Sequence, residues 1–73
     1  MSMKFDYGDE VTLTTKDDEG NFVERKCFVV GITPVDSERQ EEVFKYPRGT
    51  VLYTVEFLDG TDALAAEGDL RPR

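Results

Sequence analysis

The chain contains no histidine and no tryptophan, and only one of its 73 residues is cysteine. Without histidine it lacks the usual general base and the most common metal ligand, so a serine or cysteine nucleophile would have no base partner. The single cysteine, Cys27, cannot close a disulfide within the chain, which favours a reducing compartment. Its apolar neighbours at positions 28–30 predict a buried thiol. We therefore expect a protein that is not an enzyme and that binds no cofactor and no metal ion.

Basic residues are scarce as well. Nine Lys and Arg face 16 Asp and Glu, which gives a net charge of −7. A negative field of this size repels nucleic acid and anionic membranes and attracts basic protein surfaces. A charge of this magnitude is also ordinary for the solubility of a small domain. Composition leaves both roles open for the acidic surface.

Long apolar runs are absent. No segment approaches the ~20 apolar residues that a membrane-spanning helix needs, and the first ten residues carry no apolar stretch of a secretory signal. The length fits one domain over residues 1–73. We expect a single domain located in the cytoplasm.

The clearest structural pattern is the alternation of residues 51–58. Val51, Tyr53, Val55 and Phe57 fall on one face of a strand, and the residues between them on the other. The dipeptide at positions 59–60, Asp-Gly, then predicts a tight hairpin turn of type I′, which requires positive φ at both central residues. This pattern predicts a mainly β domain.

Further strands are predicted on both sides of this hairpin. Residues 9–15 place Val11 and Leu13 inward, and a polar turn at 16–21 leads into a second strand at 22–32. That strand changes from alternating to continuously apolar at 27–30, which predicts burial on both faces or a bulge near Gly31. Residues 62–66 are predicted as the return strand, 67–70 as a single 3₁₀-type turn, and 70–73 as a short final strand or a tail.

A short helix of about two turns is predicted between the second and third strands, within residues 33–47. Ser37 and Gln40 have the spacing of a capping box, with Ser37 as the N-cap. Pro47 closes the segment, because the residue before a proline avoids the helical region. Glu41 and Lys45 have the spacing of a favourable ion pair.

The apolar stripe of this helix is narrow, and it is formed by Gln40, Val43 and Phe44. Phe44 and Tyr46 follow a dense acidic run, a combination that suggests a contact surface. The alternative is a flap that packs Phe44 onto the open end of a β-barrel formed by the strands.

The order of these elements resembles that of SH3-like small barrels, the architecture of Tudor-type and KOW-type modules. The resemblance is carried by residues 7–11 (YGDEV), by the alternating third strand with its Asp-Gly turn, and by residues 69–72 (DLRP). It implies a small barrel of four to five antiparallel strands with one short helix inserted between strands 2 and 3. Src-type SH3 domains use a tryptophan and clustered tyrosines to grip polyproline, and this chain lacks the tryptophan.

The remaining hypothesis is a non-catalytic module that binds a basic protein. Its profile resembles that of bacterial immunity proteins, which are often small, acidic and cytoplasmic, and which neutralise toxin domains that are often basic nucleases. The alternative is an accessory or regulatory module of a larger assembly, or a Tudor-like peptide reader whose aromatic residues converge into a cage. The residues assigned to partner binding are Glu38, Glu41, Glu42, Phe44, Tyr46 and Tyr7.

Overall fold

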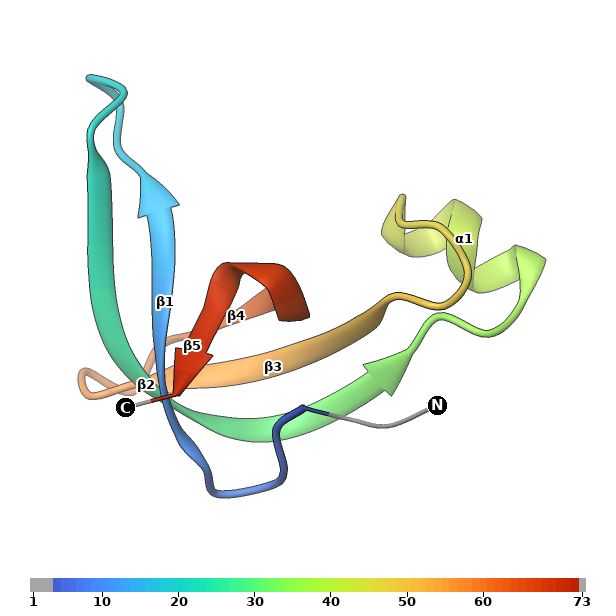
Figure 1. Ribbon diagram of the computed structural model, residues 1–73, viewed down its shortest axis with the longest axis horizontal. Helices are drawn as coiled ribbons and strands as arrows, with labels where there is room; N and C mark the ends of the chain where they lie inside the picture. Colours follow the sequence, from blue (N-terminus) through green and yellow to red (C-terminus); the bar gives the residue numbers. More distant parts are fainter. Residues whose placement is uncertain (1–3, 73) are drawn as a thin grey trace.

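The computed structural model describes residues 4–72, and it is mainly β (Figure 1). Its elements are β1 (Glu10–Lys16), β2 (Phe22–Pro34), α1 (Glu38–Phe44), β3 (Val51–Phe57), β4 (Asp62–Ala66), η1 (Glu67–Asp69) and β5 (Leu70–Pro72). The predicted elements are all present in the predicted order, with the helix between β2 and β3. Arg73, the end of the predicted final strand, lies outside the described residues. No helix within residues 4–72 is long and apolar enough to cross a membrane.

The five strands form one antiparallel sheet in the order β4-β3-β2-β1-β5. Neighbouring strands are consecutive in the chain, except that β5 lies beside β1. Within residues 4–72, β4 and β5 pair on one side only and remain the two edges of the sheet. The expected closure into a barrel is therefore not seen, because η1 connects the two edge strands without a ladder between them. The sheet is bent but open (Figure 1).

The bend is located in β2, at 13 residues the longest of the strands named above. The register shifts between Val29 and Gly31, so that Val30 and Gly31 lie opposite the single residue Thr54. A Cβ atom at Gly31 would meet the Thr54 Cβ at 3.1 Å. The predicted bulge is confirmed, and the close approach of Thr54 explains why a residue without a side chain stands there.

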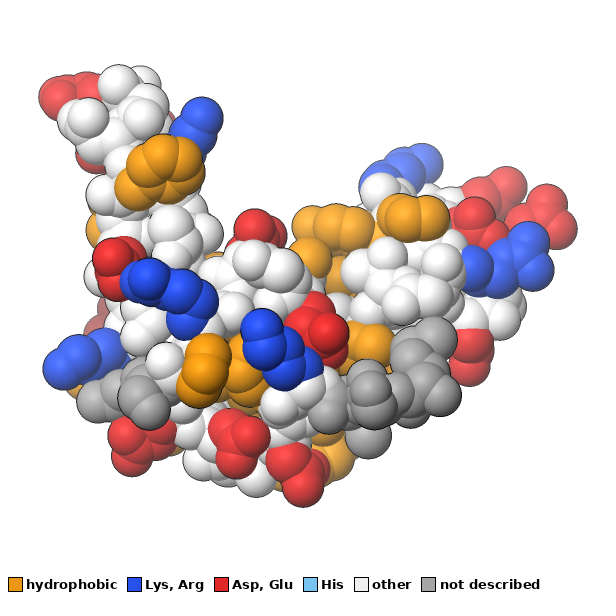
Figure 2. All heavy atoms as spheres, viewed as in Figure 1, with side chains coloured by type: hydrophobic (Ala, Val, Ile, Leu, Met, Phe, Trp, Pro, Cys, Tyr) orange, Lys and Arg blue, Asp and Glu red, His pale blue; other side chains and the backbone are white. Residues whose placement is uncertain are grey.

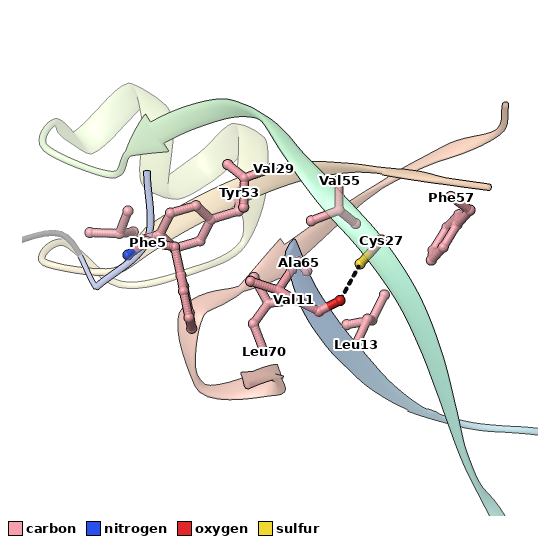
Figure 3. Close-up of a cluster of buried hydrophobic side chains, with 11 residues drawn as sticks. Phe5, Val11, Leu13, Cys27, Val29, Tyr53, Val55, Phe57, Ala65 and Leu70 are labelled. Atoms are coloured by element: carbon pink, nitrogen blue, oxygen red, sulfur yellow. Dashed lines mark hydrogen bonds between the residues drawn. The ribbon is translucent and has the colours of Figure 1, made fainter. Parts of the chain in front are cut away.

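The core lies on the concave face of the sheet (Figure 3). Val51, Tyr53, Val55 and Phe57 are all buried, as their alternation predicts. They pack with buried side chains from the other strands and from the N-terminal segment, namely Phe5, Val11, Leu13, Cys27, Val29, Ala65 and Leu70. The Cys27 side chain is buried, and its thiol donates a hydrogen bond to the carbonyl oxygen of Val11 at 3.6 Å. The prediction of a buried thiol is confirmed.

Phe5 is a core residue that the sequence analysis did not identify. It is 5% exposed, and its ring meets that of Tyr53 edge to face, with centroids 5.4 Å apart. Phe5 precedes β1 and belongs to no regular element, so no periodicity marks it. The N-terminal segment therefore supplies part of the concave core.

The turn between β1 and β2 and the turn between β3 and β4 have the same pattern of backbone hydrogen bonds, and neither is of type I′. At the β3–β4 turn, the N–H of Phe57 donates to the carbonyl of Thr61 and that of Gly60 to the carbonyl of Phe57. Only Gly60 has positive φ in this turn, at 87°. The Asp59 carboxylate accepts hydrogen bonds from the backbone and the hydroxyl of Thr61, which holds the loop in this form. The type I′ prediction is wrong, because the loop contains three residues and ends in a glycine bulge.

Beyond the rest of the sheet, β1 and β2 continue as a two-stranded hairpin, residues 14–26, which we call the arm (Figure 1). β5 pairs with β1 only at Val11–Leu13, and β3 pairs with β2 only from Cys27 onward. Residues 15–26 of the arm are exposed. Figure 2 shows a hollow between the arm and the α1 region, with acidic side chains at the arm tip and around α1.

Candidate protein-binding surface

The helix α1 is held mainly by local hydrogen bonds. The Ser37 hydroxyl accepts a hydrogen bond from the N–H of Gln40 at 3.3 Å, which confirms Ser37 as the N-cap. The Gln40 side chain reaches back to the N–H of Asp36 at 2.8 Å, one residue before the position that a capping box predicts. At the other end Lys45 adopts a left-handed conformation, φ 62°, and its N–H donates to the carbonyl of Glu41. These contacts define a helix of two turns.

The side chains of α1 remain accessible. None of its residues is buried, and the face turned toward the protein consists of Gln40, Glu41 and Phe44, which are half-buried. Val43 is 64% exposed, so the predicted stripe that included Val43 is wrong. Gln40 and Phe44 are four residues apart and share a face, whereas Val43 is directed to solvent. The helix therefore presents an apolar side chain to the outside.

Two of the three predicted carboxylates of α1 form no ion pair with the residues that the structure describes. Glu41 pairs with Arg48 rather than with the predicted Lys45, because Lys45 is the left-handed residue that ends the helix. Glu38 and Glu42 are exposed, and neither forms an ion pair with any residue in the range 4–72. The exposed Val43 directly follows Glu42. α1 thus offers two unpaired carboxylates beside an apolar side chain.

Two buried residues near the α1 region lie outside the main core. Val35 and Leu52 are each 0% exposed and are not members of the concave cluster. Val35 is fixed at both backbone groups, since its N–H donates to the carbonyl of Thr50 and its carbonyl accepts from the N–H of Gly49. The segment that carries α1 is therefore closed at its base. Phe44 is half-buried and Tyr46 is 36% exposed. These exposures fit both a contact surface and a flap, so both hypotheses stay predictions.

Tyr7 lies on another part of the molecule. It is 64% exposed in the loop before β1, where the N–H of its neighbour Gly8 donates to the carbonyl of Val29 at 2.8 Å. Figure 1 shows this loop on the opposite side of the sheet from α1. The structure therefore does not bring Tyr7 together with Phe44 and Tyr46, as an aromatic cage requires.

A groove that the sequence analysis did not identify lies between the arm and the η1–β5 segment. It encloses about 500 Å³, and its lining residues are Thr14, Phe22, Glu24, Gly68, Asp69 and Arg71. Phe22 is 71% exposed and carries the Lys16 ammonium 5.3 Å from its ring centroid. Arg71 pairs with Glu24 across the groove. The alternation of Phe22 with Glu24 could have placed both on one face, but nothing in the sequence brings η1 beside them.

Two side chains have displaced pKa values, and both displacements have structural causes. Hydrogen bonds from the Thr61 hydroxyl and backbone, with Arg25 nearby, lower the pKa of Asp59. Burial, followed by the hydrogen bond to Glu67, raises the pKa of Tyr53. Within residues 4–72 no cluster of three or more metal-ligating side chains is found, and all buried core side chains there are hydrophobic.

Comparisons of the chain with protein-family models, with curated proteins and with solved structures find no match.

Proposed function

We propose that this chain is a non-catalytic protein-binding module that captures a basic partner, and that it acts as a bacterial immunity protein which neutralises a toxin domain. We also propose that its sheet is a member of the SH3-like small barrels. The strand order, the helix between β2 and β3 and the 3₁₀ turn before the last strand support this fold assignment.

The observation that carries the functional proposal is the exposure of α1. Glu38 and Glu42 are carboxylates without an ion-pair partner among residues 4–72, and Val43 is an apolar side chain open to water beside them. Charged groups at the rim of an interface steer a partner, while an apolar contact at its centre lengthens the life of the complex. The α1 surface has both components. Tyr46 extends it beyond the end of the helix.

The net charge of −7 supports the same role. A basic toxin with a nucleic-acid substrate has a positive groove, and an acidic inhibitor is attracted to this groove by long-range fields. Such attraction increases the association rate and is weakened by salt. The partner expected here is therefore a basic protein domain whose active surface α1 covers.

The partner is first identified by affinity capture on the tagged chain, followed by mass spectrometry. Its binding to a charge-reversal variant of α1 is then measured. Glu38→Lys combined with Glu42→Lys reverses the unpaired α1 charges and leaves the Glu41–Arg48 pair intact. We expect the association rate to fall by about tenfold or more, and the ability to protect cells from the partner to fall with it.

The matched control reverses two exposed carboxylates at the tip of the arm, Asp18→Lys combined with Glu19→Lys, and changes the net charge equally. An equal loss of rate in both double variants would mean that net charge acts without a defined surface. An unchanged rate in the α1 variant, or a captured partner that is not basic, would refute the proposal.

Phe44→Ala and Tyr46→Ala test the two hypotheses for the α1 segment. Loss of partner binding with an unchanged free energy of unfolding assigns the residue to the contact surface. Loss of stability with Phe44→Ala assigns Phe44 to a flap over the sheet, and Tyr46, which is more exposed, serves as the comparison.

A further inference from the structure

One edge of the sheet, β4, is open for pairing in the part of the chain that the structure describes. β4 pairs with β3 on one side, and within residues 4–72 no strand pairs with its other side. The N–H of Phe57 donates to the carbonyl of Thr61, which fixes the alternation of the β3–β4 ladder. Ala63 and Ala65 then exchange hydrogen bonds with β3, whereas the N–H and C=O groups of Asp62 and Leu64 point away from it.

This edge has little protection against pairing. Natural edge strands carry charged side chains, especially Lys, or Pro, contain a bulge or are very short. β4 has five residues, DALAA, with Asp62 as its one charged side chain and no Lys, Arg or Pro, and its register with β3 is regular. The other edge differs, since β5 has three residues and contains Arg71 and Pro72. Of the two edges, β4 is therefore the one more open to an added strand.

The convex face beside this edge carries exposed apolar side chains. Leu64 lies opposite Thr54 and is 47% exposed. Val30, at the bulge of β2, is opposite the same threonine and is also 47% exposed. An added strand next to β4 would place one of its side chains against Leu64. Apolar contact is therefore available at the centre of the edge.

The negative charge beside β4 favours a partner segment with a cationic side chain. Glu56 on β3 and Asp62 on β4 lie directly opposite each other, and both are exposed. Like charges in this position destabilise a sheet. Neither carboxylate has an ion-pair partner within residues 4–72, where the nearby Arg25 pairs with Asp59 instead. The repulsion between Glu56 and Asp62 destabilises the free protein, and a cationic side chain of a bound partner would relieve it.

We infer that β4 is the docking strand for an extended segment of a basic protein partner. The segment adds to the sheet along Asp62–Ala66, with a Lys or Arg side chain between Glu56 and Asp62 and an apolar side chain two residues away on Leu64. Main-chain hydrogen bonds supply the affinity and the alternate side chains the specificity. The inference rests on the proposed function in one respect, the basic character of the partner, and it adds a second contact surface away from α1.

A synthetic peptide tests this site without the natural partner. The probe has seven residues, with Thr at the even positions and Lys and Val alternating at the odd ones. On binding, the amide protons of Asp62 and Leu64 should gain protection from hydrogen exchange, while those of Ala63 and Ala65, already bonded to β3, should change little. The same peptide with Glu in place of Lys is the control and should not bind. Protection absent at Asp62 and Leu64, or equal binding of the two peptides, would overturn the inference.

Two variants add a second readout. Glu56→Lys converts the like-charge pair into an ion pair, so it should raise the melting temperature and weaken binding of the Lys peptide by about tenfold or more. Glu19→Lys makes the same change in net charge at the exposed arm tip and should weaken binding less than twofold. A Glu56→Lys protein that is less stable than the wild type, or that binds the Lys peptide as tightly, contradicts the role given to this pair.

The α1 double variant separates this inference from the proposed function. It should bind the Lys peptide normally, and a loss of peptide binding there would move the peptide to α1 and refute the β4 site. If the peptide docks on β4 while partner capture is indifferent to α1 reversal, the α1 proposal fails and the β4 site stands. If the Lys peptide does not bind while the α1 variant loses its partner, the β4 site is refuted and the α1 proposal stands.

Discussion

The hydroxyl of Tyr53 donates a hydrogen bond to the carboxylate of Glu67 at 2.6 Å. The same oxygen accepts a hydrogen bond from the backbone N–H of Phe5 at 3.3 Å. One buried group on β3 thus joins the N-terminal segment to η1, and the edge-to-face contact of the two rings lies beside it (Figure 3). The Glu67 carboxylate also accepts from the N–H of Lys4, which completes the attachment.

Tyr53→Phe should lower the free energy of unfolding by about 1–3 kcal/mol, because the Phe5 N–H and the Glu67 carboxylate lose their common partner in a buried setting. Urea denaturation followed by circular dichroism measures this difference. Tyr46→Phe, at a more exposed tyrosine, is the control and should change the value by less than about 0.5 kcal/mol. Equal effects of the two substitutions would contradict the role given to Tyr53.

The same tyrosine should make stability fall at alkaline pH. Burial, then the hydrogen bond to Glu67, raises the pKa of Tyr53 above its usual 10.0. The unfolded chain therefore releases the phenolic proton at a lower pH than the folded protein does. This contribution to stability is complete below pH 10 and is lost as the pH rises through the pKa of the folded state. Melting temperatures from pH 8 to 11.5 should fall more steeply for the wild type than for Tyr53→Phe, and parallel curves would disprove the linkage.

The β2 bulge predicts an unequal pair of glycine substitutions. Gly31→Ala places a Cβ at 3.1 Å from the Thr54 Cβ, so it should destabilise the protein by about 1–3 kcal/mol. Gly68→Ala, in η1, has no atom within 4 Å of the added Cβ and no positive φ, and its effect should be small or slightly stabilising. Chemical denaturation compares the two, and similar losses would argue against the close approach of β2 and β3.

Phe57 tests the register of β3. Its side chain is 6% exposed, and the Arg25 guanidinium lies 3.7 Å from its ring centroid. Phe57→Ala should cost about 3–5 kcal/mol, which is enough to unfold a domain of this size. Leu58→Ala, one residue along the chain and 74% exposed, should be nearly neutral. A melting temperature unchanged in Phe57→Ala would show that the strand has the opposite face inward.

Salt should affect association more than dissociation. Surface fields are screened within about 8–10 Å at physiological ionic strength, so the association rate with the captured basic partner should fall steeply between 50 and 300 mM NaCl. Stopped-flow measurements on the wild type and the α1 double variant provide the comparison. An association rate that is independent of salt would mean that the charge of −7 serves solubility only.

The elements that the sequence predicted are those with a local pattern. The alternation of Val51, Tyr53, Val55 and Phe57 and the cap at Ser37 depend on residues a few positions apart, and both are confirmed. Asp62–Ala66 was predicted with the bounds that the structure has. The first two depend on side-chain patterns within one element, and the third follows from the hairpin turn before it.

The predictions that fail concern conformations and contacts that depend on residues outside the helix or strand pattern. The Asp59-Gly60 dipeptide suits type I′, but hydrogen bonds to Thr61 stabilise a loop of three residues. The partner of Glu41 is seven residues away, at Arg48, which helical spacing does not predict. The burial of Phe5 requires the meeting of segments 48 residues apart. The β4 edge was not recognised, because an unpaired edge is a property of the assembled sheet.

The order of the strands also has a kinetic meaning. All neighbouring strands except β1 and β5 are joined by a short turn or by the α1 segment. The pairing of Leu13 with Leu70 closes 57 residues at once, so it has the largest loop-closure cost of the strand pairings described above. Leu70 is buried in the core, which is complete only when this pair has formed. We therefore expect β5 to dock after the other strands during folding, and the concave apolar face to stay exposed until it does.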